Sequence, residues 1–322
     1  MTKIAYVAAA VAAFAIGSAS DLRAEYPERP IQFVVPWGAG GGTDAVARIL
    51  ASVMQEELGQ PVNVVNRTGG SGVVGHSAIA GAEPDGYTIG LGTVEITMMH
   101  WQGLTDLTYK DFDVLAVVNQ DAAGVMAPAN GDLASIQDLS AAIRNAQPGE
   151  MSASGTGQGG IWHVAMVGWT MALGAGADQV KWVPSEGSAS AITEMVAGSL
   201  DFVTASLAEG RSMMDAGRII PLATMGEERD PSYPDIPTLK ESGVDWTLMA
   251  WRGVLAPKDM PKDVRDRLYS AVETAFQSEE YQSFMQERGL GAVWLDSDDA
   301  EAFIAKSDQS FGEILAAAGL AQ

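Results

Sequence analysis

Short apolar runs rich in β-branched residues alternate along the chain with longer segments whose apolar positions recur at helical spacing. The clearest helical pattern runs from Thr43 to Leu58, where apolar residues follow i, i+3, i+4 spacing. Thr43 is suited to be the N-cap of this helix, and Gly59 to be its C-cap. Strands that alternate with helices are typical of βαβ units on a parallel sheet, so the pattern predicts an α/β fold.

The same reading places the remaining elements. Strands are expected at Ile31–Val35, Val62–Val65, Thr88–Leu91, Val114–Val118, Met151–Ser154, Val180–Val183, Phe202–Thr204 and Ile219–Ala223. Further helices are expected at about Ser135–Ala146, Ile161–Leu173, Ala189–Ala197, Pro261–Gln277 and Asp298–Ala318. The segment 229–237 contains three prolines and is read as a loop, and 245–255 as an extended segment.

The N-terminal segment has the pattern of an export signal. Lys3 is followed by an uninterrupted apolar run of 13 residues, Ile4–Ile16, and then by small residues. This run is too short to span a bilayer, which disfavours the alternative of an uncleaved anchor. We expect residues 1–24 to be a signal peptide, cleaved after Ala19 or Ala24, and the mature protein to be periplasmic.

Length, charge and cysteine content narrow the function classes. A chain of 322 residues exceeds the length of about 250–300 residues at which one hydrophobic core stops growing, so two lobes are expected. The net charge of −22 argues against nucleic acid and anionic lipid as partners, since both need a basic surface. The absence of cysteine excludes disulfides, thiolate metal sites and a cysteine nucleophile.

Three glycine-rich loops stand between a predicted strand and a predicted helix, at 38–42, 68–72 and 155–160. Such loops expose backbone N–H groups at a helix N-terminus, where the helix dipole also favours negative charge. One loop alone is more simply a tight turn. Three at equivalent strand ends would form an anion site from neutral donors.

The sequence motifs give little support for an enzyme. The first loop resembles a dinucleotide fingerprint, but Thr43 stands at its third glycine position and Asn66 where a ribose-binding acid belongs. A P-loop lysine, a G-x-S-x-G elbow and an H-E-x-x-H pair are absent from the sequence. We therefore expect no catalytic residues, no metal and no cofactor. His163 could donate into a cleft or bond to nearby backbone, and the sequence leaves both open.

Aromatic and cationic residues near the loops suggest a ligand cleft. Trp37 lies in the first glycine loop, Trp162 directly follows the third, Trp101 follows a strand and Trp251 lies in the extended segment, and such positions suit the walls of a cleft. Arg252 and Arg67 could contact a ligand or could brace the seam between two lobes by salt bridges.

A series of motifs resembles the Bug/TctC family, the extracytoplasmic solute receptors of tripartite tricarboxylate transporters. In family order these motifs are Tyr26–Ile31, Val34–Asp44, Asn66–Gly72, Pro84–Thr88, Ser152–Gly157 with His163, Val183–Gly187, Asp215–Arg218, Asp235–Thr238 and Trp251–Pro257. The resemblance extends from about Tyr26 to the C-terminus.

The resemblance implies a two-lobed, type II-like periplasmic-binding-protein fold that closes on its ligand. Two crossover strands at the hinge are expected near Val118–Met126 and Thr247–Leu255. Lobe 1 would then comprise residues 25–123 and 251–322, and lobe 2 residues 124–250. Family members hold a ligand carboxylate through backbone amides, hydroxyls and ordered water.

Carried onto this chain, the family's ligand contacts and the candidate Trp251 wall define the predicted site. The predicted ligand-binding residues are Trp37, Gly38, Gly40, Gly41, Thr43, Asn66, Ser71, Thr93, Ser154, Thr156, Gly157, Gln158, His163, Ser185, Ser206 and Trp251. Amino-acid receptors of the family tend to place a carboxylate after the 202–204 strand. Here the next acid is Glu209, which disfavours an amino acid and favours a di- or tricarboxylate.

The expected function is therefore capture of a small organic di- or tricarboxylate by a monomeric receptor, which delivers it to the permease subunits of a tripartite tricarboxylate transporter. The tryptophans keep an aromatic, phthalate-type carboxylate open. The alternatives from other classes are a ligand sensor for a two-component system and an exported hydrolase. The missing elbow and metal motifs disfavour the hydrolase.

Overall fold

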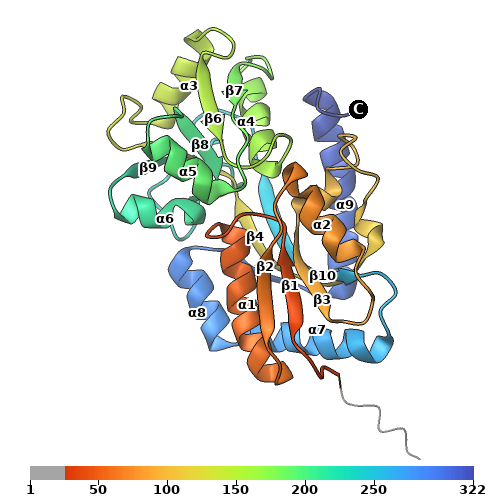
Figure 1. Cartoon of the computed structure of the whole chain (residues 1–322). Coiled ribbons are helices and arrows are strands. Elements are labelled where there is room, and N and C mark those ends of the chain that lie inside the picture. The colour runs from red at the N-terminus through yellow and green to blue at the C-terminus, as the bar shows by residue number, and fades with distance from the viewer. Residues whose placement is uncertain (1–25) are drawn as a thin grey trace, which may run out of the picture.

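The computed structural model describes residues 26–322, which form two α/β lobes (Figure 1). The predicted signal peptide lies outside these residues. Lobe 1 contains a six-stranded sheet of order β11-β4-β10-β3-β1-β2, and lobe 2 a five-stranded sheet of order β7-β6-β8-β5-β9. The strands of lobe 1 are β1 (Ile31–Val35), β2 (Val62–Asn66), β3 (Thr88–Thr93), β4 (Phe112–Ala122), β10 (Met249–Pro257) and β11 (Ala292–Leu295). Those of lobe 2 are β5 (Gly124–Pro128), β6 (Met151–Ser154), β7 (Val180–Trp182), β8 (Phe202–Ala205) and β9 (Ile219–Thr224).

The α/β fold class is confirmed, but both sheets are mixed, so the expectation of a parallel sheet is wrong in part. β1 runs parallel to β2 and β3, as βαβ units require. β10 runs antiparallel to β3 and β4 because it enters lobe 1 from lobe 2, against the direction of the βαβ strands. In lobe 2, β5 is antiparallel to β8 and β9 because it arrives from lobe 1.

Helices cover both faces of each sheet (Figure 1). They are α1 (Gly42–Leu58), α2 (Val73–Ala80), α3 (Ile136–Asn145), α4 (Ile161–Ala172), α5 (Ser188–Val196), α6 (Leu207–Asp215), α7 (Lys262–Gln277), α8 (Glu279–Arg288) and α9 (Ser297–Ala317). Short 3₁₀ helices occur at η1 (Gly70–Gly72), η2 (Val94–Thr97) and η3 (Tyr109–Asp111). The period-2 alternation of β1 divides its side chains between two cores: Ile31, Phe33 and Val35 pack with α1 and α7, and Val34 with Ile79 of α2.

Several predicted elements needed correction. The N-cap of α1 is Gly41, and Thr43 is the second residue of the helix, which frees its hydroxyl for a tertiary contact. Helices α2, α6 and α8 and strand β11 were not predicted, and β5 was expected only in part, as the end of the crossover strand near Val118–Met126. Short or glycine-containing segments such as these give weak periodic signals, and tertiary packing determines their state.

The two lobes are joined where β4 leads into β5 and where β10 begins. The ends of these strands lie side by side, since Ala122 pairs with Met249. Ala123 donates its N–H to the Leu248 carbonyl at 3.0 Å, and its carbonyl accepts from Met225. This paired crossing forms the hinge. Among residues 26–322, no helix is long and apolar enough to cross a membrane.

Candidate functional site

A small cavity lies between the two lobes, in front of the hinge. It encloses about 30 Å³, which is room for roughly two water molecules. Its walls come from the first glycine loop, the end of β3 with η2, the hinge strand β10, and the N-termini of α4, α5 and α6. The lining residues are Trp37, Gly38, Gly41, Gly42, Thr43, Thr93, Val94, Glu95, Thr156, Ile161, Trp162, Gly187, Ser188, Glu209, Ala250, Trp251 and Arg252.

Hydrogen bonds between the lobes hold the cavity closed at its rim. Gly38 donates its N–H to the Glu186 carbonyl at 3.0 Å. Ser71 donates its hydroxyl to the Gln158 carbonyl at 2.7 Å, and the Gln102 side chain donates to the Gly159 carbonyl at 2.8 Å. All three glycine loops therefore contribute to the contact between the lobes.

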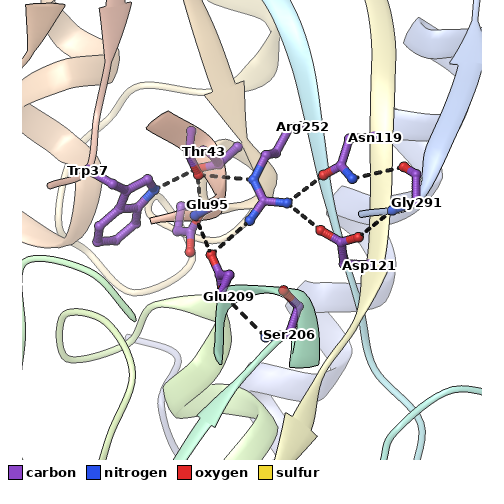
Figure 2. A network of polar contacts seen from close by, with 11 residues as sticks. Trp37, Thr43, Glu95, Asn119, Asp121, Ser206, Glu209, Arg252 and Gly291 are labelled. Atoms are coloured by element: carbon purple, nitrogen blue, oxygen red, sulfur yellow. Dashed lines mark hydrogen bonds and ion pairs between the residues drawn. The ribbon is translucent and has the colours of Figure 1, made fainter. Parts of the chain in front are cut away.

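Arg252 is the central charged residue of the site (Figure 2). Strand β10 directs its guanidinium into the hinge, where the side chain is only 4% exposed. Nε donates to the Thr43 hydroxyl at 3.0 Å, Nη2 reaches the Glu209 carboxylate at 3.1 Å, and Nη1 bonds Asn119 and Asp121. The partners come from α1, α6 and β4, so this one side chain ties both lobes to the hinge.

The charge of Arg252 is committed to protein partners. Burial acts to lower its pKa, but the adjacent Asp121 and Glu209 carboxylates outweigh that effect and raise it. Asp121 is itself fixed by the Gly291 N–H at 2.8 Å. One guanidinium thus faces two carboxylates, which supports the bracing role for Arg252 over direct ligand contact. Arg67 donates its backbone N–H to Val35 and does not line the cavity.

Glu209 crosses from lobe 2 to the N-terminus of helix α1 in lobe 1. It stands in the first turn of α6, and its Oε1 accepts the Gly42 N–H at 2.9 Å as well as Arg252 Nη2. A Cβ at position 42 would lie 2.6 Å from the same carboxylate oxygen, so glycine is required for this approach. Burial raises the pKa of Glu209, with Arg252 opposing and Asp121 adding to the shift.

Glu95 makes the reciprocal contact, from lobe 1 to the N-terminus of helix α4 in lobe 2. Its Oε1 accepts the Ile161 N–H at 2.9 Å, and its Oε2 lies 2.5 Å from the Thr93 hydroxyl. Burial raises the pKa of Glu95, since these hydrogen bonds and distant Arg252 only partly offset the loss of solvation. Glu95 lies on the Trp37 and Thr43 side of Arg252, opposite Asp121 (Figure 2).

Three tryptophans form apolar walls of the cavity. Trp37, Trp162 and Trp251 are each at most 7% exposed and belong to the first glycine loop, α4 and β10. The indole N–H of Trp37 donates to the Thr93 hydroxyl at 3.2 Å, and that of Trp251 to Ser307 at 3.1 Å. These bonds fix two of the rings in place. Trp101, also a candidate from sequence, packs near Gly312 of α9 and is 38% exposed, so that expectation is wrong.

Buried hydroxyls without protein partners surround the lobe 2 side of the cavity. The side-chain oxygens of Ser154, Thr156 and Ser206 are buried and have no hydrogen-bond partner in the described part of the chain. Thr156 lines the cavity itself, and Ser154 and Ser206 stand at the ends of β6 and β8. A buried polar group without a partner costs about 1–3 kcal/mol, so such groups mark places where a ligand or water binds.

The structure brings part of the predicted site into the cavity wall and places the rest around it. The predicted residues that line the cavity are Trp37, Gly38, Gly41, Thr43, Thr93, Thr156 and Trp251. Those that lie beside or behind this wall are Gly40, Asn66, Ser71, Ser154, Gly157, Gln158, His163, Ser185 and Ser206.

Some of these surrounding residues position the loops. The Asn66 amide donates to the Trp37 carbonyl and to Asp44, both at 2.9 Å. Burial acts to raise the pKa of Asp44, but hydrogen bonds from Arg48, the Gly40 N–H and Asn66 outweigh it and lower the pKa. The ionised Asp44 carboxylate therefore fixes the first glycine loop.

The two histidines near the site are buried and bonded to backbone. His163 accepts the Gly159 N–H on Nδ1 at 3.0 Å, which is the backbone-bonding alternative left open by the sequence. His76 accepts the Thr93 N–H on Nε2 at 3.1 Å, and its Nδ1 must then carry the proton that bonds the Gly72 carbonyl. Burial lowers the pKa of each to about 4, so neither provides positive charge at neutral pH.

Sequence reasoning missed Glu95 as a site residue and set Glu209 aside. Glu95 had no signal, because spacing cannot single out one acid among the 41 Asp and Glu residues. Glu209 had one: Ser206-x-x-Glu209 is a capping-box pattern that predicts a helix start. Since Glu209 reaches the cavity, the lack of an acid at 204–207 does not by itself disfavour an amino acid.

Comparison with known proteins identifies the family. The model of the tripartite tricarboxylate transporter family receptor, TctC, matches residues 46–320. BugT of Bordetella pertussis is 28% identical over 308 residues, which are 94% of each chain. The structure of periplasmic binding protein BugD is 27% identical, with a TM-score of 0.86 over 92% of this chain and 99% of that one.

A structure of an R. palustris protein with adipate is 25% identical, with a TM-score of 0.86, and covers 92% of this chain and 99% of that one. The family match spans most of the chain, and the similarity to BugD covers both lobes. The chain therefore belongs to the TctC family of tripartite tricarboxylate transporter receptors, which are extracytoplasmic solute-binding proteins and not enzymes.

Proposed function

We propose that this protein captures a small organic di- or tricarboxylate in the periplasm and delivers it to the membrane permease of a tripartite tricarboxylate transporter. The observation that carries this proposal is the cavity between the lobes. There, the N-termini of α4, α5 and α6 and the unpartnered hydroxyl of Thr156 lie under tryptophan walls, and Glu95 and Glu209 accept hydrogen bonds at the starts of α4 and α6. Neutral donors of this kind suit a carboxylate. The R. palustris relative with adipate supports the same ligand class.

Binding would proceed by lobe closure. With the lobes apart, a ligand reaches the exposed loops of one lobe. Closure then brings the second lobe's hydroxyls and amides onto it and removes water. The ligand shifts a pre-existing open–closed equilibrium by its greater affinity for the closed form. The hinge at Ala123 and Leu248 lets two strands bend together.

A thermal-shift screen of aliphatic and aromatic carboxylates tests the ligand class. A ligand that binds only the folded protein raises the melting temperature by mass action, and a concentration of 100 times Kd contributes roughly 2.7 kcal/mol. We expect stabilisation by an aliphatic or aromatic diacid and none by sugars. Stabilisation by sugars alone would contradict the proposal.

Thr156→Ala tests the site. Thr156 has a buried hydroxyl that lines the cavity and has no protein partner. Losing a hydrogen bond to a charged ligand costs about 1.5–3 kcal/mol, so calorimetry should show Kd raised roughly ten- to a hundredfold. The matched control is Thr170→Ala, since the Thr170 hydroxyl is satisfied by Val167 inside α4. Equal affinities for both variants would exclude Thr156 from the site.

Export with removal of the leader is a further part of the proposal. Purification from the periplasm followed by intact-mass measurement should give a chain that starts at Ser20 or Glu25. Cleavage after Ala24 removes Lys3, Asp21 and Arg23 and leaves a net charge of −23. A full-length chain retained in the membrane fraction would support the anchor alternative instead.

A further inference from the structure

Glu95 places a carboxylate in the lining of a site that is proposed to bind anionic ligands. Its side chain lines the cavity, is 2% exposed as a residue, and is hydrogen-bonded to the Thr93 hydroxyl, the Ile161 N–H and its own backbone N–H. The Ile161 N–H belongs to the first turn of α4, which is the anion-binding end of that helix. The protein's own carboxylate therefore occupies a position that a ligand carboxylate could use.

The charged groups around Glu95 do not neutralise it. On β10, Arg252 is held by Asp121 and Glu209 and acts on Glu95 only from a distance. On α6, Glu209 lines the same cavity and adds negative charge. The histidines of α2 and α4, His76 and His163, have pKa values lowered to about 4 by burial.

The closed cavity has room for only about two water molecules, so a dicarboxylate binds with the lobes further apart than here, and one of its carboxylates then lies near Glu95 because Glu95 lines the cavity wall. Two unit negative charges about 6 Å apart, at an effective dielectric constant of about 20, repel enough to weaken binding roughly a hundredfold. A proton on the Glu95 carboxylate removes this repulsion and supplies an O–H donor. The proton comes from solvent, and its release on opening returns it there.

We propose that Glu95 makes dicarboxylate capture proton-linked: the ligand binds together with one proton, which resides on Glu95. This inference rests on the proposed function and extends it. Protonation of Glu95 would decide whether the bound ligand faces a neutral or a negatively charged side chain. Burial already raises the pKa of Glu95, and a bound anion raises it further. Affinity is then constant below the pKa of the free protein and falls up to tenfold per pH unit above it.

Glu95→Gln isolates this effect. A glutamine keeps the geometry, because its Oε1 can still accept the Ile161 N–H and its amide can donate to Thr93. It removes only the titration. We expect affinity for adipate to be independent of pH in this variant, and to exceed that of the wild type by a factor that grows as the pH rises. Removal of a buried acid should therefore strengthen binding.

The experiment is calorimetry with adipate, or the diacid that gives the largest thermal shift, between pH 6.5 and 9, where the ligand carboxyls stay ionised. The control is Glu186→Gln, which removes an exposed charge at the cavity rim and should keep the wild-type pH slope. A flat wild-type profile, or the same slope in Glu95→Gln, would overturn the inference while leaving the function intact. If neither protein binds a diacid at any pH, the proposed function falls and the inference with it.

Discussion

Replacement of Arg252 by methionine is expected to lower the free energy of unfolding by about 3–5 kcal/mol. The side chain is 4% exposed and faces Asp121 and Glu209, which are equally buried. Without the guanidinium, two carboxylates remain in the hinge with no cation, and Asn119 loses its donor. Calorimetry should show a melting temperature lower by on the order of 10 °C.

The matched control is Arg29→Gln. Arg29 also pairs with a carboxylate, that of Asp85 at 3.0 Å, but both side chains are about half exposed. Exposed pairs contribute at most about 1 kcal/mol, so this variant should melt close to the wild type. Adding Glu209→Gln to the Arg252→Met protein removes one unpaired charge and should recover part of the loss. If the Arg252→Met protein has the same melting temperature as the Arg29→Gln control, the charged cluster at the hinge does not contribute to stability.

Gly157→Ala is expected to prevent full closure of the lobes without unfolding either one. A Cβ at position 157 would lie 2.4 Å from the Ser71 hydroxyl and 3.0 Å from Ser71 Cα, across the rim between the lobes. The Ser71 hydroxyl could rotate away only by losing its bond to Gln158, and the backbone contact would remain. Ligand affinity should fall at least tenfold, because the ligand binds tightly only to the closed conformation and the substitution makes that conformation rare.

Gly131→Ala serves as the control for Gly157→Ala. Gly131 lies in a lobe 2 loop, where a Cβ would lie 3.4 Å from the Pro128 carbonyl and 3.9 Å from Pro128 Cβ, both ordinary van der Waals contacts. Both variants should melt near the wild type, but only Gly157→Ala should lose affinity. Small-angle scattering with saturating ligand should give a larger radius of gyration for Gly157→Ala than for the control. Wild-type affinity in Gly157→Ala would mean that the rim contact is not part of the ligand-bound state.

The glycine loops show how far local patterns reach. Each loop is recognisable because strand, glycines and helix follow one another within about 20 residues, and the structure places all three at the contact between the lobes. The division into two lobes could also be predicted from the sequence, because the chain is longer than one hydrophobic core usually allows. The antiparallel direction of β5 and β10 could not be predicted, because the direction of a strand in a mixed sheet depends on the lobe from which the chain enters it.

The charged part of the site depends on contacts between distant segments. Glu209 bonds Gly42 across 167 positions and Arg252 across 43, and Glu95 bonds Ile161 across 66. The residues near a carboxylate in the sequence do not predict which helix N-terminus that carboxylate will contact. Its environment, and hence its pKa, is set only when both lobes fold and close.

The sequence by itself determined the α/β class, the glycine loops, the tryptophans beside them and the resemblance to the TctC receptors, because each depends on residues close together in the chain. Only the tertiary structure decided that Arg252 is committed to bracing the hinge and that Glu95 and Glu209 cap helices of the opposite lobe. The physical reason is burial: desolvation and ion pairing arise from the packing of segments that the sequence does not place side by side.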